Sequence, residues 1–131
     1  MNAHPAEQAN EWIWRSEYDI ETAEAMLKTG RYLYVAFCCQ QSVEKRLKAI
    51  IVEKTSTVPP RIHDLIRLAE RAGIELPQSQ FEELDILNSY YIESRYPEEL
   101  RRLCAGLDRK VASRRLQITK DLLSWLVQQK N

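Results

Sequence analysis

The chain has 131 residues, a length typical of one domain with a single modest core. Hydrophobic residues make up 44% and charged residues 29%, which is a globular rather than a disordered composition. Basic and acidic residues balance at 19 each, so overall charge indicates no attraction to RNA or DNA, although a local basic patch is compatible with it. No apolar run approaches the ~20 residues that span a bilayer, and the N-terminus has no signal-peptide pattern, so we expect a cytoplasmic protein.

Glycine is scarce, with 3 in the chain, and good helix formers are plentiful, so the apolar spacing predicts helices almost throughout. Residues 1–7 are expected to form a flexible tail, followed by one domain over 8–131. The first helix is predicted over about 8–29 and the second over about 32–54. Because little more than Gly30 separates them, these two helices must lie antiparallel as a hairpin.

A proline pair after this hairpin prevents the chain from continuing as a helix. A short third helix is predicted over 61–73, a fourth over about 78–94 and a fifth over about 108–129. The pattern over 97–108 is weaker and predicts one short helix and a turn. No strand pattern is present. The predicted fold is therefore all-α, an antiparallel bundle of four long helices plus a short helix.

Polar residues interrupt the apolar rows of three predicted helices. In the second helix, helical spacing places Gln40 and Glu44 in the same row as Phe37 and Leu47. The interrupting residues of the first and fourth helices are Ser16, Asp19, Asn88 and Arg95. A buried carboxylate is costly alone, but it is tolerated when an Arg pairs with it or when amides donate hydrogen bonds to it.

We therefore predict a buried polar network between the helices, formed by Asp19, Gln40, Glu44, Asn88 and Arg95. This network requires that Glu44 or Asp19 lies within salt-bridge distance of Arg95. Two interpretations stay open: the network fixes the register of the helices, or it lines a ligand cleft at one end of the bundle. The spacing alone favours the first.

The cations and the histidine near this row also have two interpretations each. Lys45 and Lys48 are either ligand contacts or solvated charges on the outer face of the second helix, and solvation is the better prediction for Lys48 than for Lys45. His63, at the start of the third helix, is expected to be a capping or packing residue. A catalytic base would need a substrate proton within hydrogen-bond reach, and nothing in the sequence provides one.

The string YYIESRYPEEL, residues 90–100, combines aromatic residues with an arginine. Tyr90 and Tyr91 are expected to fill core. Two interpretations of Arg95 and Tyr96 are equally good. They are structural residues at the end of a helix, with Arg95 paired to Glu44 or Asp19, or they bind a nucleotide or phosphate through a guanidinium and a stacking ring.

No catalytic or metal-binding motif of general chemistry is present. The sequence has no Gly-rich phosphate loop, no GxSxG and no HExxH. Its three cysteines form no CxxC pair, so we expect buried or half-buried thiols and neither metal nor cofactor. They are Cys38, Cys39 and Cys104.

Four stretches, in the expected order, resemble motifs of HEPN domains (higher eukaryotes and prokaryotes nucleotide-binding). The first is EWIWRSEYDIETAEAML, which resembles W-x-x-x-A-x-x-D-L-x-x-A, with Ser16 and Ile20 as departures. The second is YLYVAFCCQQSVEKRLKAI, which resembles F-x-x-Q-Q-A-x-E-K-x-L-K-A, with Ser42 in place of Ala. The others are PPRIHDLIRL, which resembles P-x-x-H-D-L, and YYIESRYPEEL, which resembles Y-x-x-x-R-Y-P-D/E. Together they cover about residues 10–128.

The resemblance implies a helical bundle, commonly a homodimer, of the small bacterial and archaeal type encoded beside a minimal nucleotidyltransferase. Two roles are attributed to such proteins: a substrate-binding or regulatory subunit of that enzyme, or a toxin that cleaves RNA. The ribonuclease branch carries an Arg that is followed, after four to six residues, by a His. Here Arg95 is followed by YPEELRR and no His occurs downstream, which argues against RNA cleavage.

The resemblance also implies roles for the matching positions, which are Asp19, Gln41, Glu44, Lys45, Lys48, His63, Arg95 and Tyr96. Lys45, Arg95 and Tyr96 are expected to contact a nucleotide phosphate or base, with Lys48 in the same group. Asp19 and Glu44 would orient Arg95. His63 would brace the turn at the proline pair against the bundle, and Gln41 would support the polar network.

One principal function and two alternatives follow. The principal one is a non-enzymatic, nucleotide-binding, dimeric partner of a minimal nucleotidyltransferase, as one half of a toxin–antitoxin-like pair. The first alternative is a metal-independent RNase toxin, in which Arg95 would act in catalysis. The second is a helical dimerisation module without a ligand.

Overall fold

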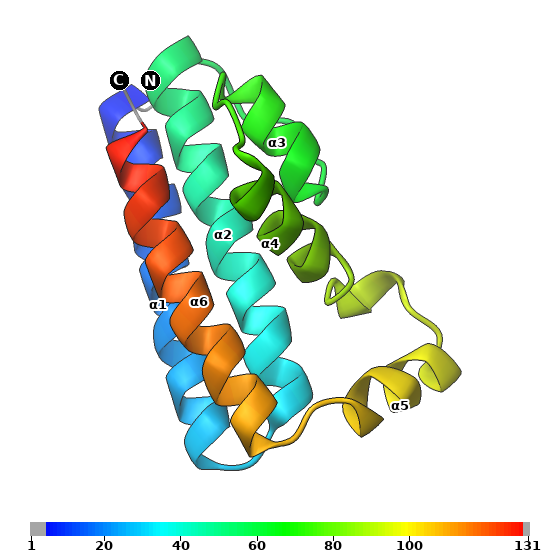
Figure 1. Cartoon of the computed structure of the whole chain (residues 1–131). Coiled ribbons are helices and arrows are strands. Elements are labelled where there is room, and N and C mark those ends of the chain that lie inside the picture. Colours follow the sequence, from blue (N-terminus) through cyan, green and yellow to red (C-terminus); the bar gives the residue numbers. More distant parts are fainter. Residues whose placement is uncertain (1–4, 130–131) are drawn as a thin grey trace.

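The computed structural model describes residues 5–129, and all regular elements in this part of the chain are helical. In chain order they are α1 (Pro5–Lys28), α2 (Tyr32–Thr55), α3 (Leu65–Arg71), α4 (Gln78–Asn88), the 3₁₀ turn η1 (Ile92–Ser94), α5 (Pro97–Ala105) and α6 (Arg109–Gln128). The long helices α1, α2 and α6 lie side by side, and α3 and α4 pack against α2 (Figure 1). The predicted all-α bundle is confirmed, and no helix in the described part is long and apolar enough to cross a membrane.

The predicted hairpin of α1 and α2 forms because the chain reverses at Gly30. This residue has φ +78°, a left-handed conformation that glycine adopts without the strain of a Cβ atom. The Arg31 amide then donates to the Met26 carbonyl at 2.9 Å, which satisfies one of the free carbonyls at the end of α1. As a result α2 starts beside the end of α1 and runs back along it.

Helix α2 is the centre of the molecule. It packs against α1 and α6 on one side and against α3 and α4 on the other (Figure 1). Every residue from Leu47 to Val52 is buried, Lys48 included. The largest enclosed apolar side chains of the core are Leu47, Ile50, Leu65, Leu68, Leu84, Leu87 and Leu126. A helix enclosed in this way has no fully solvated face between Leu47 and Val52. Its polar residue in this stretch, Lys48, is therefore buried as well.

Three helix boundaries differ from the prediction. Helix α1 begins at Pro5, so residues 5–7 belong to the helix and not to the predicted tail, whose other residues lie outside the described part. Helix α3 begins later, at Leu65, because the Asp64 side chain caps it. Helix α4 ends at Asn88 rather than at 94, and a turn and η1 follow.

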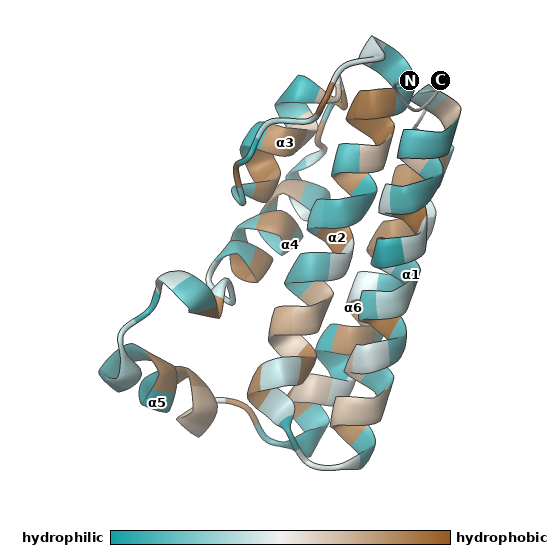
Figure 2. Cartoon of the chain, turned by 180° about the vertical axis from the view of Figure 1, so that it is seen from behind, coloured by the Kyte–Doolittle hydropathy of each residue, from teal (hydrophilic) through white to brown (hydrophobic). Residues whose placement is uncertain are grey.

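The short helix α5 lies to one side of the three long helices, as the two opposite views show, and contacts α2 (Figures 1 and 2). None of its residues is buried. Cys104, which we predicted to be buried or half-buried, is exposed on this helix, while Cys38 is half-buried and Cys39 is buried as predicted.

Candidate functional site

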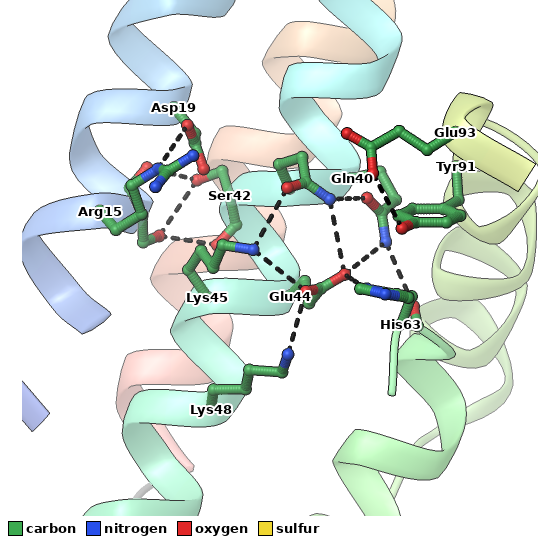
Figure 3. Close-up of polar contacts among 12 residues, drawn as sticks. Arg15, Asp19, Gln40, Ser42, Glu44, Lys45, Lys48, His63, Tyr91 and Glu93 are labelled. Atoms are coloured by element: carbon green, nitrogen blue, oxygen red, sulfur yellow. Dashed lines mark hydrogen bonds and ion pairs between the residues drawn. The ribbon is translucent and has the colours of Figure 1, made fainter. Parts of the chain in front are cut away.

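A fully buried carboxylate, that of Glu44 on α2, lies at the centre of the candidate site (Figure 3). Its Oε2 accepts hydrogen bonds from Lys45 Nζ and Lys48 Nζ, both at 3.1 Å. Its Oε1 lies 3.0 Å from His63 Nδ1 and 3.2 Å from Gln40 Nε2, so both oxygens are held by donors. We name this group the Glu44 cluster: Gln40, Gln41, Glu44, Lys45, Lys48 and His63.

Helix geometry assembles most of the cluster. Gln40, Glu44 and Lys48 follow one another at four-residue steps and therefore share a face of α2. Gln41 links to this row because its Nε2 donates to Gln40 Oε1 at 2.7 Å. Only His63 comes from outside the helix, and Gln40 Nε2 donates to its backbone carbonyl at 3.2 Å. These contacts hold the segment that follows the proline pair against α2.

Opposing effects act on the Glu44 carboxyl. Burial raises its pKa, but the charges of Lys45 and Lys48 and the hydrogen bond from His63 outweigh burial, so its pKa lies below the usual range. Glu44 is therefore ionised at neutral pH. Since one carboxylate faces two ammonium groups, the cluster has a surplus positive charge of one.

The His63 side chain is about half exposed, and one of its ring nitrogens faces Glu44. An ionised carboxylate only accepts hydrogen bonds, so Nδ1 of His63 carries the proton that it shares with Glu44. Nε2 is then free for another partner, and 47% of the side chain is exposed. The ring stacks on Tyr91, with centroids 4.2 Å apart and planes at 15°. The imidazole is thus fixed on one edge by Glu44 and on one face by Tyr91, and about half of the side chain remains exposed.

Of the two interpretations of Lys45 and Lys48, the one that makes them solvated charges is wrong. Only 12% of the Lys45 side chain and 7% of the Lys48 side chain are exposed. Lys48 is the more enclosed of the two, contrary to the predicted order, and its Nζ lies 5.5 Å from the centroid of the Trp12 ring on α1. The reason is that α2 is covered on both sides, so this row of the helix has no solvated outer face.

Asp19 is buried as predicted, but it belongs to a separate contact. Its Oδ1 accepts from Arg15 Nε at 3.4 Å, and its Oδ2 is buried without a hydrogen-bond partner. Burial raises the pKa of Asp19, although Arg15 and Lys45 partly offset this effect. Asp19 therefore does not orient Arg95.

Arg95 lies outside the Glu44 cluster, which contradicts the predicted ion pair with Glu44 or Asp19. Its Nη1 donates to Glu99 Oε2 at 3.1 Å and its Nη2 to the Ser89 carbonyl at 3.1 Å. The prediction failed because it assumed that the fourth helix continues to residue 94, whereas α4 ends at Asn88 and the row of side chains ends there. Tyr96, at the start of α5, is 76% exposed.

Asn88 is also part of a different contact from the one predicted. Its Oδ1 accepts from the Leu65 amide at 2.9 Å, and its Nδ2 donates to Asp64 Oδ1 at 3.0 Å. Asp64 in turn accepts from the first amides of α3. The predicted single network is therefore divided into three contacts: the Glu44 cluster, the Asp19–Arg15 pair, and an Asn88–Asp64 cap that joins α4 to α3.

Three contacts were missed in the sequence: Ser16 with Ser42, Arg15 with Asp19, and Tyr91 with His63. Ser16 Oγ donates to the Ser42 carbonyl at 2.7 Å, and Ser42 Oγ donates to the Ser16 carbonyl at 2.8 Å. Both serines replace an Ala of the motifs quoted above, and this joint departure was the available signal. Arg15 stands four residues before Asp19, a spacing that also predicts contact. The stack of Tyr91 on His63 had no sequence signal, since it joins two irregular segments.

The comparisons with known proteins identify the family and the fold. A model of the HEPN domain matches residues 9–130. The chain belongs to the HEPN family. Two solved structures are similar to this HEPN chain over nearly its whole length, at 22% sequence identity each. No curated protein sequence matches it.

The first of these structures is TT1696 from Thermus thermophilus, with a TM-score of 0.77, covering 93% of this chain and 98% of the other. The second is ST0689, described as an archaeal HEPN homologue, with a TM-score of 0.70, covering 94% of this chain and 98% of the other. At this identity the two structures establish the HEPN fold.

Proposed function

We propose that this HEPN protein binds a nucleotide and acts as a partner or regulatory subunit of a minimal nucleotidyltransferase, as a cytoplasmic homodimer in a toxin–antitoxin-like pair. The observation that carries the proposal is the surplus positive charge of the Glu44 cluster beside the half-exposed ring of His63, which stacks on Tyr91. A phosphate that carries an aromatic base complements a cation next to aromatic rings.

Lys45 and His63 are the residues that we assign to the phosphate. Two donors of the Lys45 ammonium are directed at Glu44 and Gln41, which leaves one N–H for a further acceptor. The His63 side chain is 47% exposed, and in this proposal its Nε2 contacts the phosphate. Lys48 is enclosed and neutralises Glu44, so in this proposal it supports the site without touching the ligand.

The proposal therefore moves the phosphate contact away from Arg95. The guanidinium of Arg95 is engaged by Glu99 and by the Ser89 carbonyl, and it makes no ion pair with Glu44. Tyr96 beside it is exposed and remains available to stack on a base or on a partner protein. Arg95 and Tyr96 therefore stay in the proposal as residues at the start of α5 that contact the base or a partner protein, and not the phosphate.

Calorimetric titration with ATP tests the nucleotide part. We expect binding by the natural chain and a loss of about tenfold in affinity for Lys45→Gln and for His63→Gln, since each removes one charge-assisted hydrogen bond. Lys110→Gln, which changes an exposed lysine at the start of α6, is the matched control and should bind as the natural chain does. If nucleotides neither bind nor shift the melting temperature, the proposal fails and the ligand-free dimerisation module takes its place.

Co-expression tests the partner. The nucleotidyltransferase encoded next to this gene, if present, should co-purify with the tagged chain as a stable complex. A chain that elutes alone under these conditions contradicts the subunit role.

The RNase toxin remains the second candidate, and one observation favours it. Glu44 fixes the proton of His63 on Nδ1, so Nε2 is left as the proton acceptor of a half-exposed ring, which is how a carboxylate prepares a catalytic histidine. Induction of the chain alone, followed by growth and RNA integrity, tests this function. Toxicity that is lost in both His63→Ala and Arg95→Ala would replace the principal proposal.

A further inference from the structure

Helix α5 has an apolar face that the rest of the described chain covers only in part. Leu100, Leu103 and Cys104 share one side of this helix through their three- and four-residue spacing. Both leucines are only half-buried and Cys104 is exposed. A helix of 9 residues is not stable in water by itself, so its formation normally depends on packing of such a face.

This partly exposed surface continues from α5 onto the start of α2. Cys104 lines a hollow together with Tyr34 and the turn between α1 and α2. Tyr34 is 50% exposed and Tyr96, just before α5, is 76% exposed. Two exposed tyrosines beside half-buried leucines give the composition of a protein interface, where aromatic residues supply most of the contact energy.

The charges of α5 indicate which molecule covers its apolar face. Its acidic residues, Glu98 and Glu99, precede its basic residues, Arg101 and Arg102. Of these four, only Glu99 has an ion pair within the described chain, with Arg95. When two copies of such a helix lie antiparallel, the acidic end of each faces the basic end of the other. This self-complementarity is what a two-fold symmetric interface requires.

We propose that a second copy of this chain covers α5, so that the two α5 helices pair antiparallel around a two-fold axis through their apolar faces. This inference rests on the homodimer of the proposed function and assigns its face. It places the Arg95 and Tyr96 end of one copy beside the Cys104 end of the other, at the centre of the dimer.

Charge exchange tests the pairing. The variants E98K/E99K and R101E/R102E should each dimerise about tenfold more weakly, because like charges then face each other across the axis. An equimolar mixture of the two should restore the dimer as a heterodimer. Analytical ultracentrifugation of each variant and of the mixture measures this effect.

A second pair of variants separates the interface from folding. Leu103→Glu should produce a folded monomer, since no residue of α5 is buried, whereas Val127→Glu on α6, also at an exposed position, should leave the dimer intact. Cys104 provides an independent measurement, because dimerisation should slow its alkylation by a maleimide. Burial raises the pKa of Cys38 to about 12 and that of Cys39 to about 11, which keeps these two thiols unreactive.

The outcomes are distinguishable. A natural chain that is monomeric at every concentration overturns both this inference and the homodimer of the proposed function. A dimer that persists unchanged in the charge variants and in Leu103→Glu, with Cys104 fully reactive, overturns the inference alone. Nucleotide binding is measured separately and decides neither outcome.

Discussion

Two ion pairs of this protein have the same sequence spacing and the same N···O distance but different surroundings. Glu44 and Lys48 on α2, and Arg95 and Glu99 at α5, are both four residues apart, and each pair has its closest N···O distance at 3.1 Å. The side chains of the first pair are 0% and 7% exposed, whereas those of the second are 34% and 36% exposed. Burial, and not distance, therefore separates a pair on which the fold depends from one that it can lose.

The same contrast applies to the regions around these pairs. The Glu44 cluster lies between α1, α2 and the segment before α3, and its members hold one another through many contacts (Figure 3). The α5 segment has one ion pair, no buried residue and few neighbours. We expect substitutions in the Glu44 cluster to lower the free energy of unfolding, and substitutions in the α5 segment to weaken dimerisation instead.

Glu44→Gln should have the largest effect. The variant leaves two enclosed lysines without their counter-charge, so we expect the free energy of unfolding to fall by about 3–5 kcal/mol. Chemical denaturation monitored by circular dichroism measures the loss. A loss no larger than that of Glu99→Gln would show that burial does not distinguish the two pairs.

The sequence was sufficient for the fold and for half of the site. The apolar spacing and Gly30 predicted the hairpin, and the interrupted row predicted that Gln40 and Glu44 are buried, since both follow from helical geometry alone. The position of Arg95 could not be obtained in this way. It depended on where α4 ends. The last residue of this helix is Asn88, whose side chain contacts Asp64. Such a long-range contact cannot be read from a local sequence pattern.

The lysines show a second limit of sequence reasoning. Periodicity tells which residues share a face of a helix, but it does not tell how many faces are covered. Lys48 was assigned to an outer face that does not exist, because α2 is packed between α1 on one side and α3 on the other. Only the tertiary arrangement contains this information.

Asn88→Ala tests the cap that joins α4 to α3, a long-range contact that the sequence did not predict. It removes the acceptor of the Leu65 amide and the donor to Asp64, so we expect a loss of about 1–2 kcal/mol in the free energy of unfolding. Hydrogen exchange should rise mainly in α3. Ser89→Ala, at the neighbouring position, is the control, and an equal effect of both variants would contradict the assigned role.

Asp19 and Glu44 should give opposite pH dependences. The pKa of Glu44 is lowered from 4.5, so its contribution to stability is present above that pH and is lost as pH falls. The pKa of Asp19 is raised from 3.8 by burial, so the folded state is destabilised as pH rises and this carboxyl ionises.

Denaturation between about pH 3 and pH 7 measures both effects, which we expect to be on the order of 1 kcal/mol across this range. Relative to the natural chain, Asp19→Asn should become more stable as pH rises, whereas Glu44→Gln should become less stable. Slopes of the same sign would contradict the assigned environments of these two carboxyls.

Glu99→Gln should have the smallest effect on stability, and this is what makes it informative. Its pair with Arg95 is about one third exposed on each side, so the free energy of unfolding should change by about 0–0.5 kcal/mol. Such a change is within the range of ordinary surface substitutions, and the melting temperature should barely move. If α5 is the dimer face, however, the same substitution weakens the pairing of its acidic end with the basic end of a second copy, so dimerisation should fall while stability does not. A Glu99→Gln chain that loses both in parallel would show that α5 belongs to the folding unit as firmly as Glu44 does.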